Sequence, residues 1–405
     1  MDFSPERHNE WRRGWRIVLG AALGVGTGAS LFFYTFSLFV LPMSTEFGVT
    51  RGAMAGVQAL VIVGAISSPL IGWATDQWGF RKVFTCCILA MIAVHLSTAL
   101  LVTSLPMFAI SALCIGFVGN GTTGLTTTRP VNAWFDANRG LALGLSAMGL
   151  SLLAVVTPPL LAGLISTAGW RAGYFALAAL AGSVGLPAVL LLVKNEPGDG
   201  DQTRIVRERP PSDFSFLRGA AFWQLAASLV AMSIAGGGFI SQMSPMIQEE
   251  GMSAPHAAFA VSAYAVGQIF GRILTGLALD NFPPRRVAFF FIFVPASGFL
   301  LLWGGNHNFI LALIAAMLIG VQHGAEIDIF AFFVARRFGM HRYGSVYGAV
   351  LSLGWVGNAL GIVGFGRLRD VAGSYDVPEL IAAVSLVVGA VLIAGVSLPP
   401  RQAEV

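Results

Sequence analysis

Apolar runs of about 20 residues or more alternate with short polar segments along the whole chain. A helix rises about 1.5 Å per residue, so such a run crosses a hydrocarbon core of about 30 Å. The pattern predicts an all-α membrane protein with twelve transmembrane helices. The predicted spans are 14–42, 52–74, 82–103, 106–134, 139–166, 171–193, 219–247, 255–279, 284–305, 307–335, 343–366 and 378–399.

The only long polar stretch lies near the middle of the chain, at residues 194–218. It contains Pro197, Gly198, Pro210 and Pro211, which are typical of a connection between folded parts. We therefore predict an N-terminal six-helix half over residues 1–193, a cytoplasmic linker over 194–218 and a C-terminal six-helix half over 219–405.

A segment that follows the second predicted span returns after the eighth span, 204 positions later. The matching pairs are Gly72 and Gly276, Ala74 and Ala278, Asp76 and Asp280, Arg81 and Arg285, and Val83 and Val287. Gly140 and Gly144 match Gly344 and Gly348 at the same offset. Two halves related by a parallel repeat are typical of transporters that hold their substrate between the halves.

Composition supports a membrane protein and argues against an enzyme. Hydrophobic residues make up 56% of the chain and charged residues 11%, whereas soluble domains carry about 25% charged residues. The first apolar run is too long for a cleavable signal peptide. The three cysteines lie in apolar runs and have no disulfide or metal-binding spacing. No nucleophile–base cluster or phosphate-binding glycine loop is present, so we expect no enzymatic activity, cofactor, metal or nucleic-acid partner.

The distribution of basic residues predicts the orientation in the membrane. If the N-terminus is inside, most of the 24 Lys and Arg residues fall on the cytoplasmic side. The outer side then holds only Arg51, Arg171, Arg367 and Arg369, and Arg272 belongs to neither side. The positive-inside rule therefore predicts that both termini are cytoplasmic.

The repeated segment resembles the loop motif of the major facilitator superfamily. That motif places a Gly, an Asp, a second Gly and basic residues between the second and third spans, here Gly72, Asp76, Gly79, Arg81 and Lys82. The usual basic residue after the Asp is replaced by Gln77, and Pro283 stands in the second copy at the position of Gly79. The resemblance covers nearly the whole chain and implies the twelve-helix fold of that superfamily.

Three further segments are similar to the monocarboxylate transporter family and its bacterial members. They are Trp134-Phe135-x-x-x-Arg139-Gly-Leu-Ala-Leu-Gly144 with Gly149, Gly271-Arg272-x-x-x-Gly276, and Gly324-Ala-Glu326-x-Asp328 followed by Arg337-Phe-Gly339. The resemblance implies transport of a small carboxylate by alternating access. Animal members carry an Asp four residues before the arginine of span eight and a Lys in span one. Here Gln268 occupies the first position and span one has no Lys, so their proton route does not carry over directly.

Arg272 is the central candidate for substrate binding. It lies eight residues before Asp280, roughly 12 Å inside the membrane and near its midplane. A cation at this depth costs at least about 2.5–3.5 kcal/mol, which a carboxylate bound by two charge-assisted hydrogen bonds can offset. The resemblance implies this same role, and a structural ion pair with a buried acid is the alternative. One deep cation suits one carboxylate, which favours a monocarboxylate such as lactate or pyruvate.

Two acids of span ten are candidates for proton coupling. Asp328 lies eight residues before Arg336, at the depth of Arg272, and Glu326 lies slightly deeper. They are about 200° apart around the helix, so they face different neighbours. Burial favours the neutral form of a carboxyl group and a nearby arginine favours the charged form, so substrate binding at Arg272 can change their protonation. His323 is a secondary candidate, and a purely structural network is the alternative.

The repeat predicts that the halves have different roles. Arg272, Gln268, Glu326 and Asp328 correspond to Ser68, Gly64, Thr122 and Gly124, so the C-terminal half is expected to hold both the anion and the proton. The N-terminal half would then supply neutral hydrogen bonds. Further candidates for substrate contact, for each of which simple packing is the favoured alternative, are Tyr34, Asn120, Thr123, Thr127, Gln242, Tyr264, Gln268, Phe332, Trp355 and Asn358.

The two repeated loops are candidates for a cytoplasmic gate. By resemblance, Gly72, Asp76, Arg81, Asp280 and Arg285 would form breakable salt bridges and helix-end contacts when the transporter opens outward. The alternative is a tight turn whose charges only set the orientation. Gly140, Gly144 and Gly149 are expected to let span five approach a neighbouring helix closely.

The expected partners are a small carboxylate anion, a proton and the lipid bilayer, and a monomer is expected to function. Two rival functions remain: an organic-anion exchanger, which Arg272 would serve equally, and an exporter of amphipathic compounds. Thr157-Pro158-Pro159-Leu-Leu-Ala-Gly163 does not match the Gly-Pro signature of such exporters. The resemblance favours a bacterial inner membrane.

Overall fold

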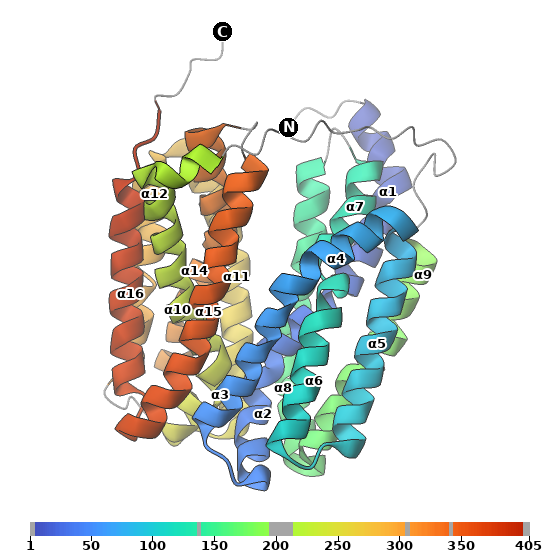
Figure 1. The fold of residues 1–405 in the computed structure, drawn as a ribbon, viewed down its shortest axis with the longest axis vertical. Helices are drawn as coiled ribbons and strands as arrows, with labels where there is room; N and C mark the ends of the chain where they lie inside the picture. The colour runs from blue at the N-terminus through green and yellow to red at the C-terminus, as the bar shows by residue number, and fades with distance from the viewer. Residues whose placement is uncertain (1–4, 136–138, 194–213, 304–307, 340–342, 400–405) are drawn as a thin grey trace. The chain divides into compact units, whose positions relative to one another are not determined.

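The computed structural model describes residues 5–135, 139–193, 214–303, 308–339 and 343–399, and these residues form helices and their connections (Figure 1). The predicted linker falls largely outside the described residues. The chain separates into two compact units, unit 1 with Met1–Arg204 and Ser253–Ser262, and unit 2 with Ile205–Met252 and Ala263–Val405. The division differs from the predicted halves mainly in Ser253–Ser262, which group with unit 1.

Unit 1 is built from helices that follow one another along the first half of the chain (Figure 1). They are α1 (Pro5–Gly26), α2 (Ala29–Phe47), α3 (Arg51–Ala59), the 3₁₀ turn η1 (Leu60–Ile62), α4 (Val63–Trp78), α5 (Phe80–Leu101), α6 (Leu105–Gly119), the 3₁₀ turn η2 (Asn120–Thr122), α7 (Gly124–Trp134), α8 (Arg139–Leu180), the π-helical turn η3 (Ala181–Gly185) and α9 (Leu186–Leu192). The buried core of this unit includes Ile17, Phe84, Ile88 and Val189.

Unit 2 has fewer breaks in its helices. They are the short η4 (Phe214–Arg218), α10 (Ala220–Glu249), α11 (Ala254–Asn281), α12 (Pro284–Phe293), α13 (Ala296–Leu302), α14 (Phe309–Phe338), α15 (Tyr343–Ala372) and α16 (Asp376–Gly395). The first turns of α11, up to Ser262, group with unit 1. Helices α10, α15 and α16 pack against one another and form one side of the unit (Figure 1).

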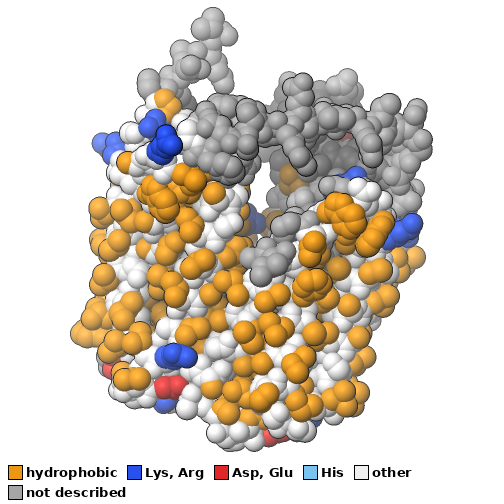
Figure 2. All heavy atoms as spheres, in the orientation of Figure 1, with side chains coloured by type: hydrophobic (Ala, Val, Ile, Leu, Met, Phe, Trp, Pro, Cys, Tyr) orange, Lys and Arg blue, Asp and Glu red, His pale blue; other side chains and the backbone are white. Residues whose placement is uncertain are grey.

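The described residues contain ten helical stretches long and apolar enough to cross a membrane. One of these, Ala142–Leu192, covers two predicted spans, which meet at Gly169, where the backbone has φ 81° and ψ 170°. The predicted span 52–74 is also helical but is broken by η1 and is not among the ten. Each predicted span therefore coincides with helix, and the all-α membrane architecture is confirmed. Hydrophobic side chains cover the helices on the visible face (Figure 2).

The sequence repeat is also visible in the contacts of each unit. Arg81, in the first turn of α5, donates a hydrogen bond to the Leu190 carbonyl oxygen near the end of α9. Arg285, in the first turn of α12, donates to the Ala394 carbonyl oxygen near the end of α16, with an N···O distance of 2.5 Å. Arg285 follows Arg81 by 204 positions, and Ala394 follows Leu190 by the same 204 positions. A cation at a helix C-terminus stabilises its unpaired carbonyls and its dipole, so each arginine holds the last helix of its own unit.

Two pairs of glycines bring α11 and α14 into backbone contact. A Cβ atom at Gly267 or Gly271 of α11 would lie 2.0 Å from the Met317 carbonyl oxygen or 2.1 Å from that of Val321. On α14, a Cβ atom at Gly320 would lie 2.1 Å from the Tyr264 carbonyl oxygen. Gly324 has the same relation to Gln268, at 2.0 Å. Each helix therefore carries two glycines four residues apart, the spacing that lets membrane helices approach closely.

Unit 1 uses a glycine in the same way at one predicted position. A Cβ atom at Gly149 of α8 would lie 2.2 Å from the Ala22 carbonyl oxygen of α1, which confirms the close approach expected there. The same expectation is wrong for Gly144, where no atom lies within 4 Å of such a Cβ. The surroundings of Gly140 lie outside the described part of the structure. Close packing of span five therefore depends on Gly149.

The glycine contact predicts that Gly271→Ala destabilises the protein. The added methyl group overlaps the α14 backbone, which cannot rotate away, and overpacking costs about 1–3 kcal/mol. The midpoint of thermal unfolding in detergent should fall measurably. Gly276→Ala on the same helix is the matched control, because nothing lies within 4 Å of its Cβ position; equal midpoints for the two variants would disprove the contact.

The repeated arginine contact predicts that Arg81→Gln and Arg285→Gln lower stability by similar amounts. Each loses a favourable charge at a helix C-terminus, an effect of about 0.3–2 kcal/mol. Thermal unfolding of the purified variants measures it. Arg286→Gln is the control, since Arg286 is exposed and adjacent in sequence; a control that unfolds as early as Arg285→Gln would show that the lost charge, not the helix-end contact, matters.

Candidate functional site

The glycine contact between α11 and α14 brings Arg272 and Asp328 together. The Arg272 Nε and Asp328 Oδ2 atoms are 3.9 Å apart, and the two side chains are 29% and 38% exposed. This separation is beyond hydrogen-bonding distance. The Arg272 Nε atom is itself buried and makes no hydrogen bond within the described part of the chain. The two groups are thus neighbours at the limit of an ion pair, and the guanidinium group is not fully bonded by the protein.

Glu326 faces a different partner, as the spacing of the two acids predicts. Its Oε2 atom accepts a hydrogen bond of 2.8 Å from the Nε2 atom of Gln322, one turn earlier on α14. Gln322 is completely buried, and its Oε1 atom has no hydrogen-bond partner among the described residues. The sequence analysis did not identify Gln322, although an uncharged amide four residues before a buried acid is a signal that could have found it.

His323 and Tyr264 lie side by side between α14 and α11. Their ring centroids are 5.9 Å apart, and Tyr264 is completely buried. A Cβ atom at Gly236 of α10 would lie 3.6 Å from the His323 Nδ1 atom. Gln268, one turn after Tyr264, is also buried. The structure therefore gathers Tyr264, Gln268, Arg272, His323, Glu326 and Asp328 on two adjoining helices of unit 2.

The corresponding helices of unit 1 carry neutral groups. The Asn120 Nδ2 atom donates hydrogen bonds to the hydroxyl oxygens of Ser68, at 2.9 Å, and Ser67, at 3.2 Å. Ser68 is the repeat counterpart of Arg272. Thr123 and Thr127 each donate a hydroxyl hydrogen bond to a backbone carbonyl, to Asn120 at 2.8 Å and to Thr123 at 3.2 Å. Asn120 therefore bridges two segments of unit 1, and the two threonines bond within their own segment.

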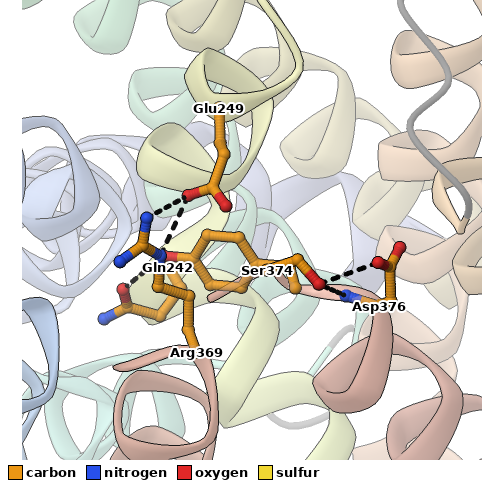
Figure 3. A network of polar contacts seen from close by, with 6 residues as sticks. Gln242, Glu249, Arg369, Ser374 and Asp376 are labelled. Carbon is orange, nitrogen blue, oxygen red and sulfur yellow. Dashed lines mark hydrogen bonds and ion pairs between the residues drawn. The ribbon is translucent and has the colours of Figure 1, made fainter. Parts of the chain in front are cut away.

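The other sequence-derived candidates are dispersed. Tyr34 is buried in α2, and Trp355 is 48% exposed on α15. Phe332 lies under the Arg336 guanidinium, 5.9 Å from the ring centroid. Asn358 packs against Gly237 of α10. The completely buried Gln242 accepts a 3.0 Å hydrogen bond from the Tyr375 hydroxyl group in a separate polar network (Figure 3).

The gate candidates show helix-end contacts within each unit. Arg81 and Arg285 bind the carbonyl oxygens described above. Gly72 has open space around its Cβ position. The side chains of Asp76 and Asp280 lie outside the described part of the structure. The Thr75 carbonyl oxygen, next to Asp76, accepts a 3.0 Å hydrogen bond from Arg129, so a cation that the sequence analysis did not assign to the gate stabilises the end of α4.

The glycine pairs were the main feature that the sequence analysis missed. Gly267 and Gly271, and Gly320 and Gly324, show the four-residue spacing of small residues that is typical of close membrane helix pairs. This spacing alone does not reveal which helices are partners, because several other glycine pairs in the chain have it.

Comparison with known proteins agrees with this architecture. The sequence matches the Major Facilitator Superfamily over residues 21–362 and 234–403. It is 24% identical over 397 residues to the uncharacterized MFS-type transporter YcxA of Bacillus subtilis, covering 93% of this chain and 92% of that protein. It is 23% identical over 397 residues to monocarboxylate transporter 4 of Gallus gallus, covering 94% and 82%.

A solved structure shows the same fold. The nucleoside transporter NupG superposes with a TM-score of 0.76 at 15% sequence identity, covering 94% of this chain and 98% of that one. This likeness concerns the fold alone. Because the family match spans most of the sequence and the helices form the corresponding architecture, this multi-pass membrane protein belongs to the Major Facilitator Superfamily and is a transporter, not an enzyme.

Proposed function

We propose that this transporter carries a small monocarboxylate together with a proton, and that Arg272 binds the carboxylate. The observation that carries the proposal is the state of the Arg272 side chain. Its Nε atom is buried and makes no hydrogen bond to any described residue, and the neighbouring carboxylate oxygen of Asp328 is 3.9 Å away. A guanidinium group offers several donors in one plane, which match the two oxygens of a carboxylate. A substrate carboxylate would supply the missing acceptors.

The charge of the site supports a substrate with one carboxylate. Arg272 is the only Lys or Arg that the sequence places near mid-depth in the spans, and the matching position of unit 1 is Ser68. A second carboxylate on the substrate would have no cation to pair with in a medium of low dielectric constant. The likeness to proteins named monocarboxylate transporters supports the same substrate class.

A proton can keep the site neutral when the substrate binds. Without substrate, Asp328 is the nearest anion to Arg272. When a substrate carboxylate binds to Arg272, Asp328 loses part of its counter-charge, and the neutral acid becomes the favoured form. The anion and the proton therefore bind together and leave together. Glu326, which accepts from Gln322, and His323 are the other groups through which the proton can move.

The membrane and the orientation belong to the same proposal. The excess of Lys and Arg at one set of helix ends supports cytoplasmic termini. With that orientation, Arg81 and Arg285 lie on the cytoplasmic side, where they stabilise helix ends next to the proposed gate. A bacterial inner membrane and a functional monomer complete the proposal.

The proposal predicts that Arg272→Gln abolishes uptake of labelled lactate and pyruvate into proteoliposomes under an inward proton gradient. The lost charge-assisted hydrogen bonds are worth about 1.5–3 kcal/mol, which corresponds to a decrease in substrate affinity of at least about tenfold. Arg272→Lys should recover only part of the activity, because it keeps the charge without the planar donors. Arg367→Gln, which removes an exposed arginine, is the control; full uptake by Arg272→Gln would refute the anchor.

The same assay separates the two rival functions. If the folded wild-type protein takes up neither acid, a ligand screen by thermal stabilisation would be the next measurement. Stabilisation by another organic anion, with exchange that is insensitive to the proton gradient, would favour an anion exchanger. Stabilisation by amphipathic compounds alone would favour an exporter.

A further prediction concerns Asp328 and Glu326. Asp328→Asn or Glu326→Gln should abolish gradient-driven uptake but spare the exchange of internal for external substrate, because exchange requires no net proton movement. Wild-type uptake should rise as the external pH falls. Any uptake that remains in Asp328→Asn or Glu326→Gln should not depend on the external pH. Asp370→Asn, which changes an exposed acid of α15, is the control. Gradient-driven uptake that survives in both variants would contradict proton coupling at α14.

A further inference from the structure

A second group of titratable side chains lies in unit 2, where α10 and α15 end and α16 begins (Figure 3). Its acidic members, here called the α16 acid cluster, are Glu249, Glu250, Asp376 and Glu379. None of them lies on α11 or α14, the helices that carry Arg272 and Asp328. The sequence analysis assigned no role to these residues, and the proposed transport mechanism does not use them.

Two members of the α16 acid cluster have clear partners. The Glu249 Oε2 atom accepts a 3.0 Å hydrogen bond from the Nε atom of Arg369 and forms an ion pair with its Nη2 atom, also at 3.0 Å. The Asp376 Oδ2 atom accepts a 2.7 Å hydrogen bond from the Ser374 hydroxyl group. Figure 3 shows the pair of Glu249 and Arg369 together with the bond between Ser374 and Asp376. The guanidinium group of Arg369 is therefore already paired with Glu249.

Glu379 is in a different situation. The residue is only 2% exposed, and its Oε1 atom has no hydrogen-bond partner among the described residues. The charges that act on it most strongly are those of three other acids, Glu250, Asp376 and Glu249. A buried carboxylate without a cation is strongly destabilising, whereas the neutral acid avoids that penalty. The surroundings of Glu379 therefore suit a carboxylic acid and not a carboxylate.

Apart from Arg369 and the exposed Arg367, the described residues of the helices packed against α16 offer no cation at this end. Helix α10 contributes Glu249 and Glu250, and α15 contributes Arg369 together with the exposed Arg367 and Asp370. Helix α13 carries no titratable residue. Arg285 of α12 binds Ala394 at the opposite end of α16, and Arg286 follows it in sequence. Tyr375 donates its hydroxyl hydrogen bond to Gln242.

Unit 1 lacks this excess of acid at the matching place. Glu46, the repeat counterpart of Glu250, forms an ion pair of 2.7 Å with Arg171 and accepts a 2.6 Å hydrogen bond from the Trp170 indole. The counterparts of Asp376 and Glu379 are Ala172 and Phe175. The acids that surround Glu379 are therefore specific to unit 2 and are not required by the shared fold.

We propose that Glu379 is a proton-binding site of unit 2, separate from the Arg272 site, and that it holds its proton at neutral pH. A proton fits better than a metal ion, because the described residues contain no group of His, Cys, Asp and Glu placed to hold one. The first turn of α16 is also connected to α10. The Glu379 amide donates to the Tyr375 carbonyl oxygen, and the Tyr375 hydroxyl group holds Gln242 of α10. Loss of the proton would add a fourth negative charge and push the first turn of α16 away from α10.

Infrared spectroscopy of the purified full-length protein tests the proposal directly. A protonated carboxyl group has a C=O stretching band separate from that of a carboxylate. In the wild type, the band of the protonated carboxyl group should be present at neutral pH, and part of it should disappear at alkaline pH. Glu379→Gln should remove that part, whereas Glu46→Gln, the matched change at the unit 1 ion pair, should leave it. An identical band in the wild type and Glu379→Gln would overturn the proposal.

Neighbouring acids provide a second test that keeps Glu379 in place. Asp376→Asn and Glu250→Gln each remove one negative charge near Glu379, so the band should disappear at a lower pH in both variants. Unchanged titration in both would show that Glu379 does not belong to an interacting cluster and would also overturn the proposal. These variants keep the test valid if Glu379→Gln does not fold.

The pH dependence of stability provides a third measurement. A proton that is bound in the folded state and absent in the unfolded state makes stability fall as the pH rises, until the folded state loses the proton as well. The unfolding midpoint of the wild type should therefore decrease from neutral to alkaline pH. The decrease should be smaller in Glu379→Gln, and an equal decrease in both proteins would contradict a proton at Glu379. Because none of these measurements uses transport, failure here would leave the proposed function untouched.

Discussion

The backbone contact between α11 and α14 is the interaction on which the candidate site depends. Lipid offers no hydrophobic advantage to helix pairing, so membrane helices associate through close packing and polar contacts. Gly267 and Gly271 on one helix and Gly320 and Gly324 on the other remove the side chains that would hold the backbones apart. Arg272 and Asp328 each follow one of these glycines within a turn or so, and the contact therefore determines their separation.

The two units solve the same packing problem with different chemistry. Arg81 and Arg285 hold equivalent helix ends, so the shared architecture is preserved. At the position of Arg272, however, unit 1 has Ser68 bonded to Asn120. At the helix ends, unit 1 has the paired Glu46 and Arg171 where unit 2 has the α16 acid cluster. The titratable groups of the Arg272 site and of the α16 acid cluster thus both belong to unit 2. A change in their protonation alters the net charge of that unit.

Arguments from depth and arguments from side-chain chemistry specify different properties of a candidate residue. Counting residues from Asp280 and Arg336 placed Arg272 and Asp328 at one level, and the structure has them 3.9 Å apart. The helical period correctly separated Glu326 from Asp328. Gln242 and Trp355 were chosen for their polarity or size, and the structure shows Gln242 bonded to Tyr375 and Trp355 exposed on α15. The depth of a residue follows from the rise of its own helix. The direction in which its side chain points depends on how that helix is rotated against its neighbours.

The sequence by itself determined the membrane class, the helical spans, the repeat and the family, because apolar length and a constant offset are properties of a linear chain. It also determined that the candidate charges Arg272, Glu326 and Asp328 all belong to the second half of the chain. Only the tertiary structure decided which glycines meet, that Gln322 bonds Glu326, and that Glu379 is buried among other acids. These features join residues from different helices, or depend on burial between them, and the free energy of a buried carboxyl group is set by neighbours that are distant in sequence.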